Sequence, residues 1–321
     1  MRLGVALGWH TLCWEDLQDL VRRAEALGYA AAYVDGDISM LGQRRDDDVL
    51  DGWTVTTALL ARSLRIQIGS IRLVHHWNAA RLAQCAATAF RMAPGRLRFF
   101  ASIGDRPEDP AFDLAPPPVA DRIAWLDETL DACRALWRGE SVTRDGRFVR
   151  LRDARVRPVP GEGALPIEVA AKGRALMPVL ARHAAVWNVN LPAAPARVAR
   201  AAGWLAEACA EQGRDPGEIR RSQWIFARVQ ERPDTAGALA EFRRLNPWFD
   251  GIPDAEIAPS LVLGDGASCA ARLGELAEAL SLDLPVVDLS GLDYRTARRN
   301  LEAIPAGGGF VDSPSSRAVP S

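Results

Sequence analysis

The residue of this chain best suited to hold an anion is its one lysine. Lys172 lies in the segment IEVAAKGR (167–174), and arginines supply the other strongly basic side chains of the 321 residues. The apolar run before it predicts a strand, and the residues after Gly173 predict a helix. Free backbone N–H groups where a helix begins, together with the cations Lys172 and Arg174, would form a phosphate-binding site. The alternative is an ordinary basic turn exposed to water.

Histidines are the second group that could do chemistry. His10, His75 and His76 are three of the four in the chain, and each follows a predicted strand, where an imidazole can serve as acid or base. Adjacent side chains on an extended segment point in opposite directions, so we expect one of His75 and His76 to face a pocket. His183 lies late in a predicted helix, where its charge is favourable without any function. Because no HxxE or HxH spacing occurs, the sequence predicts no metal site.

Short apolar runs alternate with amphipathic helices along the chain, and this alternation must position those residues. The runs that predict strands are 3–7, 30–34, 65–71, 96–101, 167–171, 185–189, 223–229 and 285–289. Such alternation implies parallel strands joined by right-handed crossovers. Eight such units favour a closed (β/α)8 TIM barrel over an open doubly wound sheet. The lack of a GxGxxG motif after the first strand also weakens the dinucleotide-binding alternative.

Two insertions are expected in this barrel, after strands 4 and 7. Residues 139–165 contain TRDGRFVRL, which predicts a hairpin with Asp145-Gly146 at its turn. Residues 246–265 predict a long loop that could act as a lid. We expect a single domain over residues 1–305, followed by a Gly/Ser/Pro-rich, disordered tail over 306–321.

Residues that follow the strands of such a barrel form its active site, at the C-terminal face. In chain order they include Trp9, His10, Asp35, Asp37, His75, His76, Trp77, Ser102, Lys172, Arg174, Asn188, Asn190 and Arg228. The stretch GSIRL (69–73) is also unusual, because a glycine and a serine interrupt a strand that otherwise reads as buried. This pattern predicts a bulge or the close approach of a ligand, with packing against a neighbouring strand as the alternative.

Composition excludes several classes of protein. The formal net charge of -2 gives no reason to expect nucleic acid or an anionic membrane as partner, and no apolar run is long enough to span a membrane. The five scattered cysteines, without a CxxC pair, argue against a disulfide framework or a zinc site. The expected location is the cytoplasm.

Over roughly residues 1–305 the chain resembles the bacterial luciferase-like monooxygenase superfamily, which includes FMN-dependent monooxygenases and oxidoreductases that use coenzyme F420. The segments that carry the resemblance are WEDLQDLVRRAEALGYAAAYV, LDGWTVTTALLARSLRIQIGSIRL, LAQCAATAFRMAPGRLRFFASIG, DRIAWLDETLDACRALWRGE, PIEVAAKGRALMPVLARHAAVWN and GDGASCAARLGELAEAL. The resemblance implies a TIM barrel with an insertion, a homodimer, and reduced FMN or F420 on the C-terminal face. It also allows a separate flavin reductase as partner.

The same resemblance assigns residues to the cofactor. Family members commonly carry a non-proline cis peptide at a bulge in the third strand, and the matching bond here is Ser70–Ile71. Their Gly-Gly segment after strand 5, which approaches the flavin phosphate, matches 170–173. Because this chain lacks the glycine pair, the Lys172 cation would take over the role of its backbone in holding the phosphate. The cofactor-binding residues implied in this way are Ser70, Ile71, Ser102, Ala171, Lys172, Gly173 and Arg174.

The chain also departs from the family pattern. The acidic residue that family members follow with histidine after strand 2 is here followed by glycine, in Asp35-Gly36-Asp37. The resemblance predicts an oxidoreductase or monooxygenase that acts on a small organic substrate through O2 activation or hydride transfer. Its candidate acid/base residues are His10, Asp37, His75 and His76. Two alternatives stay open: a barrel that has lost its cofactor and acts as a binding protein or non-redox enzyme, and a Schiff-base lyase that uses Lys172.

Overall fold

The polypeptide folds into a closed barrel of parallel strands. The computed structural model describes residues 1–8, 11–36, 48–104 and 116–306. The barrel strands are β1 (Gly4–Ala6), β2 (Ala31–Val34), β3 (Gln67–Leu73), β4 (Leu97–Ser102), β7 (Ile167–Ala171), β8 (Val186–Val189), β9 (Arg220–Val229) and β11 (Leu284–Asp288). They pair in this order, and β11 pairs with β1 to close the ring. The predicted (β/α)8 TIM barrel is confirmed.

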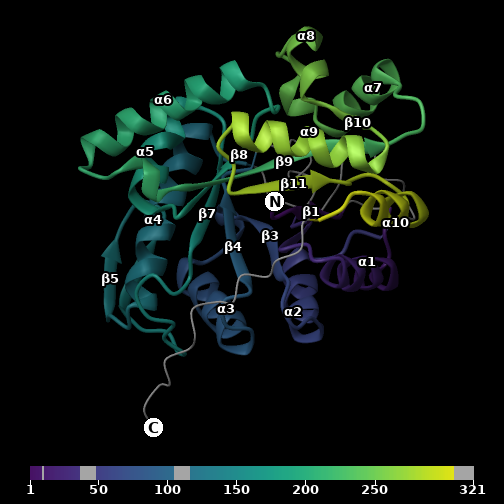
Figure 1. Ribbon diagram of the computed structural model, residues 1–321. Helices are drawn as coiled ribbons and strands as arrows, with labels where there is room; N and C mark the ends of the chain where they lie inside the picture. Colours follow the sequence, from purple (N-terminus) through teal and green to yellow (C-terminus); the bar gives the residue numbers. More distant parts are fainter. Residues whose placement is uncertain (9–10, 37–47, 105–115, 307–321) are drawn as a thin grey trace.

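Helices form an outer ring around these strands (Figure 1). They are α1 (Trp14–Ala26), α2 (Gly52–Arg62), α3 (Ala79–Met92), α4 (Val119–Trp137), α5 (Met177–His183), α6 (Pro195–Glu211), α9 (Gly266–Ala279) and α10 (Tyr294–Ala303). Several begin at a residue whose side chain accepts a hydrogen bond from the first turn, which satisfies a backbone N–H that the helix itself leaves unpaired. Asp51, Asn78, Asp265 and Asp293 cap α2, α3, α9 and α10 in this way.

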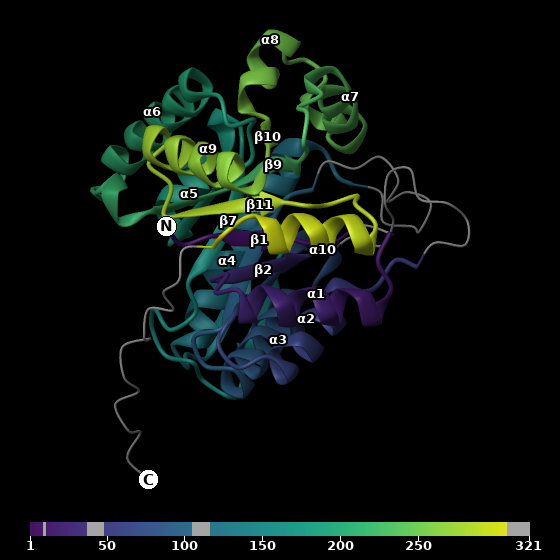
Figure 2. The same ribbon diagram turned by 45° about the vertical axis from the view of Figure 1, so that its right-hand side comes forward.

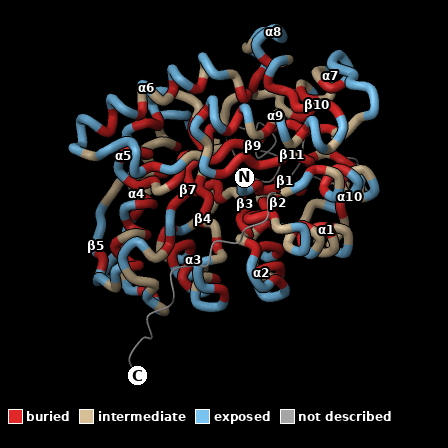
Figure 3. The backbone as a smooth tube through the Cα atoms, viewed as in Figure 1, coloured by how far each residue is buried: buried red, intermediate tan, exposed pale blue. Residues whose placement is uncertain are grey.

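The strands are buried on both faces, which explains why they read as continuous apolar runs. Buried residues concentrate along the strands and on the inner sides of the helices, whereas exposed residues lie along the outer sides of the helices (Figure 3). A small apolar cluster fills part of the barrel itself and includes Ala6, Tyr33, Phe100, Ala170 and Val286. The larger core packs the outer faces of the strands against the helices.

An ion pair lies inside the barrel, among the strands. The Glu168 carboxylate on β7 accepts hydrogen bonds from Arg98 Nε and Nη2 on β4, at 2.8 and 2.6 Å. It also accepts from the hydroxyl groups of Tyr33 on β2 and Ser222 on β9. Glu168 is 1% exposed, so these four strands are joined by a carboxylate that water does not solvate.

The glycine of GSIRL serves this packing. A Cβ atom at Gly69 would come within 2.8 Å of Arg98 Cβ, so a side chain there would displace the arginine. Strand β3 pairs with β4 in continuous register from Ile68 to Leu73, without a bulge. The one cis peptide bond among the described residues joins Arg157 and Pro158, so the Ser70–Ile71 bond is trans. The expected bulge and non-proline cis peptide are therefore wrong, because β3 is held straight by its ladder with β4.

The barrel is interrupted at both predicted places, by a hairpin as expected and by a second insertion that is more ordered than the expected loop. The first is a hairpin of β5 (Val142–Asp145) and β6 (Arg150–Ala154) that follows α4. Its turn is fixed by Glu128 of α4, whose carboxylate accepts hydrogen bonds from the backbone N–H groups of Arg147, Phe148 and Val149. The hairpin therefore packs on the outer ring and lies outside the barrel.

The second insertion, residues 246–265, follows α7 (Thr235–Leu245). In place of the predicted long loop it contains α8 (Asp254–Ile257), β10 (Val262–Gly264) and two 3-10 turns. Both views show α7 and α8 in the upper part of the molecule, near α9 and β10 (Figures 1 and 2). Strand β9 pairs with β8 through 220–222 and with β10 through 227–229, so β10 is the strand paired with the carboxyl end of β9. Residues 307–321 lie outside the described residues, so the predicted tail stays a prediction.

We expect the variant Glu168→Ala to lower the free energy of unfolding by about 3–5 kcal/mol, because it leaves Arg98 as an unpaired buried charge. Urea unfolding followed by circular dichroism measures the loss, and Glu168→Gln, which keeps a hydrogen-bond acceptor, should lose less. The matched control is Glu207→Ala, which breaks the exposed ion pair with Arg174 and should cost less than about 1 kcal/mol. Equal losses for the two alanine variants would contradict this role of Glu168.

Candidate active site

A cavity lies at the carboxyl ends of the barrel strands, the position where the sequence predicts an active site. It contains about 1060 Å³ of empty space, part of which opens to solvent. The residues that line it are Asp35, Ile71, Leu73, Phe100, Ser102, Gly104, Ala170, Asn188, Val189, Asn190, Leu191, Pro192, Ala193, Trp224, Ile225, Phe226, Phe242, Asn246, Trp248, Phe249, Ser260, Asp288 and Ser290. They come from most of the barrel strands and from the second insertion, so the cavity depends on closure of the barrel.

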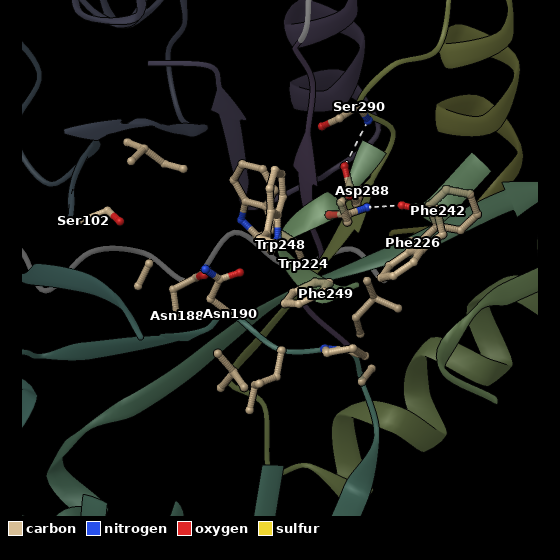
Figure 4. A pocket seen from close by; sticks show the side chains of 18 of the residues that line it. Ser102, Asn188, Asn190, Trp224, Phe226, Phe242, Trp248, Phe249, Asp288 and Ser290 are labelled. Carbon is tan, nitrogen blue, oxygen red and sulfur yellow. Dashed lines mark hydrogen bonds between the residues drawn. The ribbon is translucent and has the colours of Figure 1, made fainter. Parts of the chain in front are cut away.

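Polar side chains line the cavity where β4 and β8 end. They are Ser102, Asn188 and Asn190, and the last two lie close together (Figure 4). Asn188 Nδ2 donates a hydrogen bond to Ser222 Oγ at 3.1 Å, and Ser222 in turn donates to Glu168. The buried carboxylate therefore fixes the orientation of an amide at the cavity.

Asp35 is positioned by glycines, and its side chain also lines the cavity. A Cβ atom at Gly8 would come within 2.5 Å of Asp35 Oδ2, and one at Gly52 would collide with the Asp35 carbonyl oxygen. A Cβ atom at Gly36 would collide with the carbonyl oxygen of Ile71. The close approach of β1, β2, β3 and α2 therefore leaves no space for the histidine that the family pattern has next to this aspartate.

Aromatic rings form the opposite side of the cavity. Trp224 and Phe226 come from β9, Phe242 from α7, and Trp248 and Phe249 from the second insertion. Phe242 packs edge-on against Phe226 and parallel to Phe249, with ring centroids 5.8 and 5.9 Å apart. The second insertion thus covers part of the barrel mouth with an apolar roof.

Asp288 and Ser290, at the end of β11, complete the lining. The Asp288 carboxylate accepts a hydrogen bond from Ser290 N at 3.0 Å. Burial raises the pKa of Asp288 above its ordinary value, whereas the charge of Arg228 and the hydrogen bonds from Ser290 act in the opposite direction. This carboxyl group is therefore better suited to hold a proton than a carboxyl group in water.

Lys172 lies beside the cavity and is half-buried. Its Nζ atom is 5.9 Å from the centroid of the Phe249 ring, and Phe249 lines the cavity. Gly173 has open space where a side chain would stand. Arg174 instead pairs with Glu207 at 2.8 Å with 71% of its side chain exposed, so the two predicted cations do not face one site.

The turn after β7 also differs from the predicted helix start. Residues Arg174–Leu176 form a 3-10 turn, and α5 itself has 7 residues. The Ala171 side chain packs in the core between strands and helices, and its carbonyl oxygen accepts a hydrogen bond from Trp187 Nε1. Ala170, its neighbour, is the residue of this strand that faces the cavity.

The other predicted cofactor residues are divided between the two faces of the sheet. Ile71 and Ser102 line the cavity. The Ser70 hydroxyl points to α2, where it lies 2.5 Å from Thr56 Oγ1 and 3.0 Å from the Gly52 carbonyl oxygen. Because side chains alternate along a strand, Ser70 and Ile71 cannot both face the barrel interior.

His75 and His76 lie in a second pocket, outside the barrel mouth. The segment Val74–His76 is a 3-10 turn instead of the extended chain expected from the sequence, so both imidazoles line the same pocket, with centroids 4.2 Å apart. This pocket is formed with Trp125 of α4 and Phe148 of the hairpin. Burial and the charges of His76 and Arg122 lower the pKa of His75 to about 4. The expectation that one of the two faces the main site is therefore corrected.

The remaining predicted residues divide into two groups. Trp9, His10 and Asp37 lie outside the described residues. Trp77 lines the second pocket and packs against Trp53, so it forms no wall of the main cavity.

Several residues of the cavity were missed by reading the sequence. Asp288 and Ser290 follow the eighth strand and obey the same positional rule as the other candidates. Trp224 lies inside a strand, and the sequence does not reveal which face of a strand buried on both sides points into the barrel.

Neither a metal cluster nor a membrane helix is found in the part of the chain that the structure describes. Within it, no group of three or more metal-ligating side chains comes together. Its helices are also too short or too polar to cross a bilayer.

Fold and cavity together define an α/β-barrel protein with a cavity at the carboxyl ends of its strands. A family model described as luciferase-like monooxygenase matches residues 1–283. The chain belongs to this family, and the resemblance noted in the sequence is confirmed.

Similar curated proteins include F420-dependent glucose-6-phosphate dehydrogenases. The one from Mycobacterium leprae (strain Br4923) is 27% identical over 304 residues, which cover 86% of this chain and 88% of that protein. The one from Nocardia farcinica (strain IFM 10152) is 35% identical over 131 residues, or 40% of this chain. That match, and a similar one to the Mycobacterium avium (strain 104) protein, spans 38% of the relative's length.

Solved structures share the fold at low sequence identity. An F420-dependent secondary alcohol dehydrogenase in complex with an F420-acetone adduct has a TM-score of 0.78 and 19% identity, and covers 95% of this chain and 99% of its own. EDTA monooxygenase from Chelativorans sp. BNC1 has a TM-score of 0.76 and 13% identity, with 95% and 92% coverage. At these identities the likeness shows the fold.

The lowered pKa of His75 predicts a pH-dependent stability. Between its ordinary pKa of 6.5 and its folded value of about 4, the unfolded chain binds a proton that the folded chain does not. The free energy of unfolding should therefore fall as the pH decreases through this window. In the variant His75→Asn, the free energy of unfolding should fall less between about pH 7 and about pH 5 than in the unmodified protein. The difference should be about 1 kcal/mol, after discounting for the partial exposure of the imidazole. Urea titrations at the two pH values test this, and parallel pH profiles would show that the imidazole is not desolvated.

Proposed function

We propose that the protein is an oxidoreductase that binds coenzyme F420 or reduced FMN in the barrel mouth and acts on a small organic substrate. The observation that carries this proposal is a cavity at the carboxyl ends of the strands of a luciferase-like barrel. Its walls are mainly apolar and aromatic, with a few polar side chains among them, as is typical of sites for small molecules and cofactors.

The residues present fit such a cofactor. Ile71 and Ala170 offer an apolar surface for the flat ring, and Ser102, Asn188 and Asn190 offer hydrogen-bonding groups for its polar edge. An anionic tail that leaves the cavity past Phe249 meets the ammonium group of Lys172 and the uncovered backbone at Gly173.

The cofactor supplies the redox chemistry, by hydride transfer or by reduction of O2, and the protein binds, orients and excludes water. The aromatic roof serves the exclusion of water. Asp35 and Asp288 are the ionisable groups that line the described part of the cavity, so we propose that they hold or accept the proton that accompanies the reaction. His10 and Asp37 remain proposed acid/base residues. His75 and His76 are less suited, because they line the second pocket.

Relatives that are named as F420-dependent dehydrogenases favour hydride exchange with F420. Neighbours in fold that are named as monooxygenases keep reduced FMN and O2 as the second possibility. A homodimer, a cytoplasmic location and, for FMN, a separate reductase belong to the same proposal.

Two other functions receive less support. A Schiff-base lyase requires a lysine amine inside the cavity, and Lys172 is not among the residues that line it. A barrel that has lost its cofactor is favoured by Gly36, which stands where the family pattern has a histidine. It is disfavoured by the polar side chains Ser102, Asn188 and Asn190, which line the cavity where a cofactor could accept or donate hydrogen bonds.

Absorption difference spectra and calorimetry with F420 and with reduced FMN test the proposal, and we expect one of them to bind. Lys172→Ala should weaken that binding about tenfold or more, because it removes a charge-assisted contact to the anionic tail. Arg174→Ala is the matched control, since its guanidinium already pairs with Glu207 and its loss should change the affinity about twofold at most. Absence of binding by both cofactors would end the proposal.

A further inference from the structure

The proposed function does not identify the substrate, but the charges around the cavity indicate its chemical class. We infer that the substrate is an apolar amine, held in its protonated form between the aromatic roof and the carboxylate of Asp288, and that phosphorylated and carboxylated molecules are excluded. This inference rests on the proposed function, because it concerns the part of the same cavity that the cofactor leaves to the substrate.

The described lining of the cavity carries acidic groups and no basic ones. Asp35 and Asp288 contribute carboxylates, whereas lysine, arginine and histidine are absent from the lining within the described residues. An anion placed here would lose its hydration and meet like charges, which is costly at a buried site. A cation would instead gain a partner, and its positive charge would in turn favour the ionised form of Asp288.

Arg228 is a cation beside this end of the cavity, and all its donors are already used. Its Nε and Nη2 atoms donate to Glu241, its Nη1 atom to the carbonyl oxygens of Ala227 and Asp288, and its Nη2 atom also to Ser290. A guanidinium group has five N–H donors, so none is left for a substrate anion. The group also lies 3.9 Å from the centroid of the Phe226 ring and is 4% exposed.

The aromatic side chains beside Asp288 suit an organic cation. Trp224 and Trp248 lie between Asp288 on one side and Asn188 and Asn190 on the other (Figure 4). Faces of tryptophan rings attract ammonium groups more strongly than other aromatic faces do, and the attraction increases when water is excluded. The apolar body of the substrate would pack on the rings, with its ammonium group directed to the carboxylate.

Positive and negative charge are therefore separated around the cavity. Lys172 lies beside the Phe249 ring, where the proposed anionic tail of the cofactor would neutralise it. Asp288 lies at the end of β11, next to the roof. A sugar phosphate, the substrate named for the curated relatives, would find no uncommitted cation at the Asp288 end in the described part of the chain.

Binding of a matched series of small ligands to the full-length protein tests the inference. The series is 2-phenylethylamine, 2-phenylethanol, phenylacetate and glucose 6-phosphate, and titration calorimetry measures the dissociation constant of each. We expect the amine to bind about tenfold more tightly than the alcohol, and both anions to bind more weakly than the alcohol. Asp288→Asn should remove the advantage of the amine over the alcohol.

Asp250→Asn is the matched control, because it removes the same charge from an exposed position on the second insertion. It should leave the series unchanged. Tighter binding of phenylacetate or glucose 6-phosphate, equal binding of amine and alcohol, or no binding of the amine at millimolar concentration would each overturn the inference. Calorimetry with F420 and reduced FMN on the same preparations separates the two claims. An anion preference in a protein that binds a cofactor rejects the substrate class alone, whereas failure to bind either cofactor rejects the proposed function.

Discussion

One buried carboxylate connects the floor of the barrel to the cavity above it. Glu168 joins Arg98, Tyr33 and Ser222, which belong to three other strands. In each of the four segments, the residue two positions after the network residue lines the cavity. These residues are Asp35, Phe100, Ala170 and Trp224. Because side chains alternate along a strand, fixing the lower residue also fixes the upper one. Burial of these charged groups costs desolvation energy. We therefore attribute the role of the network to fixing the register of four strands relative to one another, because their ends must form one site.

Much of the fold can be predicted from the sequence, because a parallel barrel leaves a simple pattern. Apolar runs alternate with amphipathic helices, and the two interruptions of this rhythm became the hairpin near Glu128 and the roof over the mouth. The predictions that depended on the local backbone conformation were wrong at two places in and after β3. The family pattern suggested a distorted bond at Ser70, whereas the ladder with β4 keeps β3 regular. The pair His75 and His76 read as an extended segment, whereas a 3-10 turn carries both rings to another pocket.

The candidate site was predicted in outline and missed in detail for a physical reason. The sequence shows which residues lie at the ends of strands. This rule correctly predicted that Ser102, Asn188 and Asn190 line the cavity. When both faces of a strand are buried, the sequence does not show which side chains point into the barrel. Ala171 was therefore predicted to face the cavity, whereas Ala170 does, and Trp224 was not predicted. Lys172, the one lysine, lies near the cavity as its position suggested. Arg174, which was expected to bind the same anion, forms an ion pair with Glu207 instead. This contact joins segments far apart in the sequence, so a local sequence pattern does not predict it.

The central claim is that a tricyclic redox cofactor lies in the barrel mouth with its ring against Ile71 and Ala170 and its anionic tail near Lys172. A crystal structure of the protein with bound F420 or FMN tests it most directly. The account predicts electron density for the ring between β3, β7 and the aromatic roof, with tail oxygens within hydrogen-bonding distance of Lys172 Nζ. Density for the ring in the pocket of His75 and His76, or a tail that leaves the barrel far from Lys172, would contradict it.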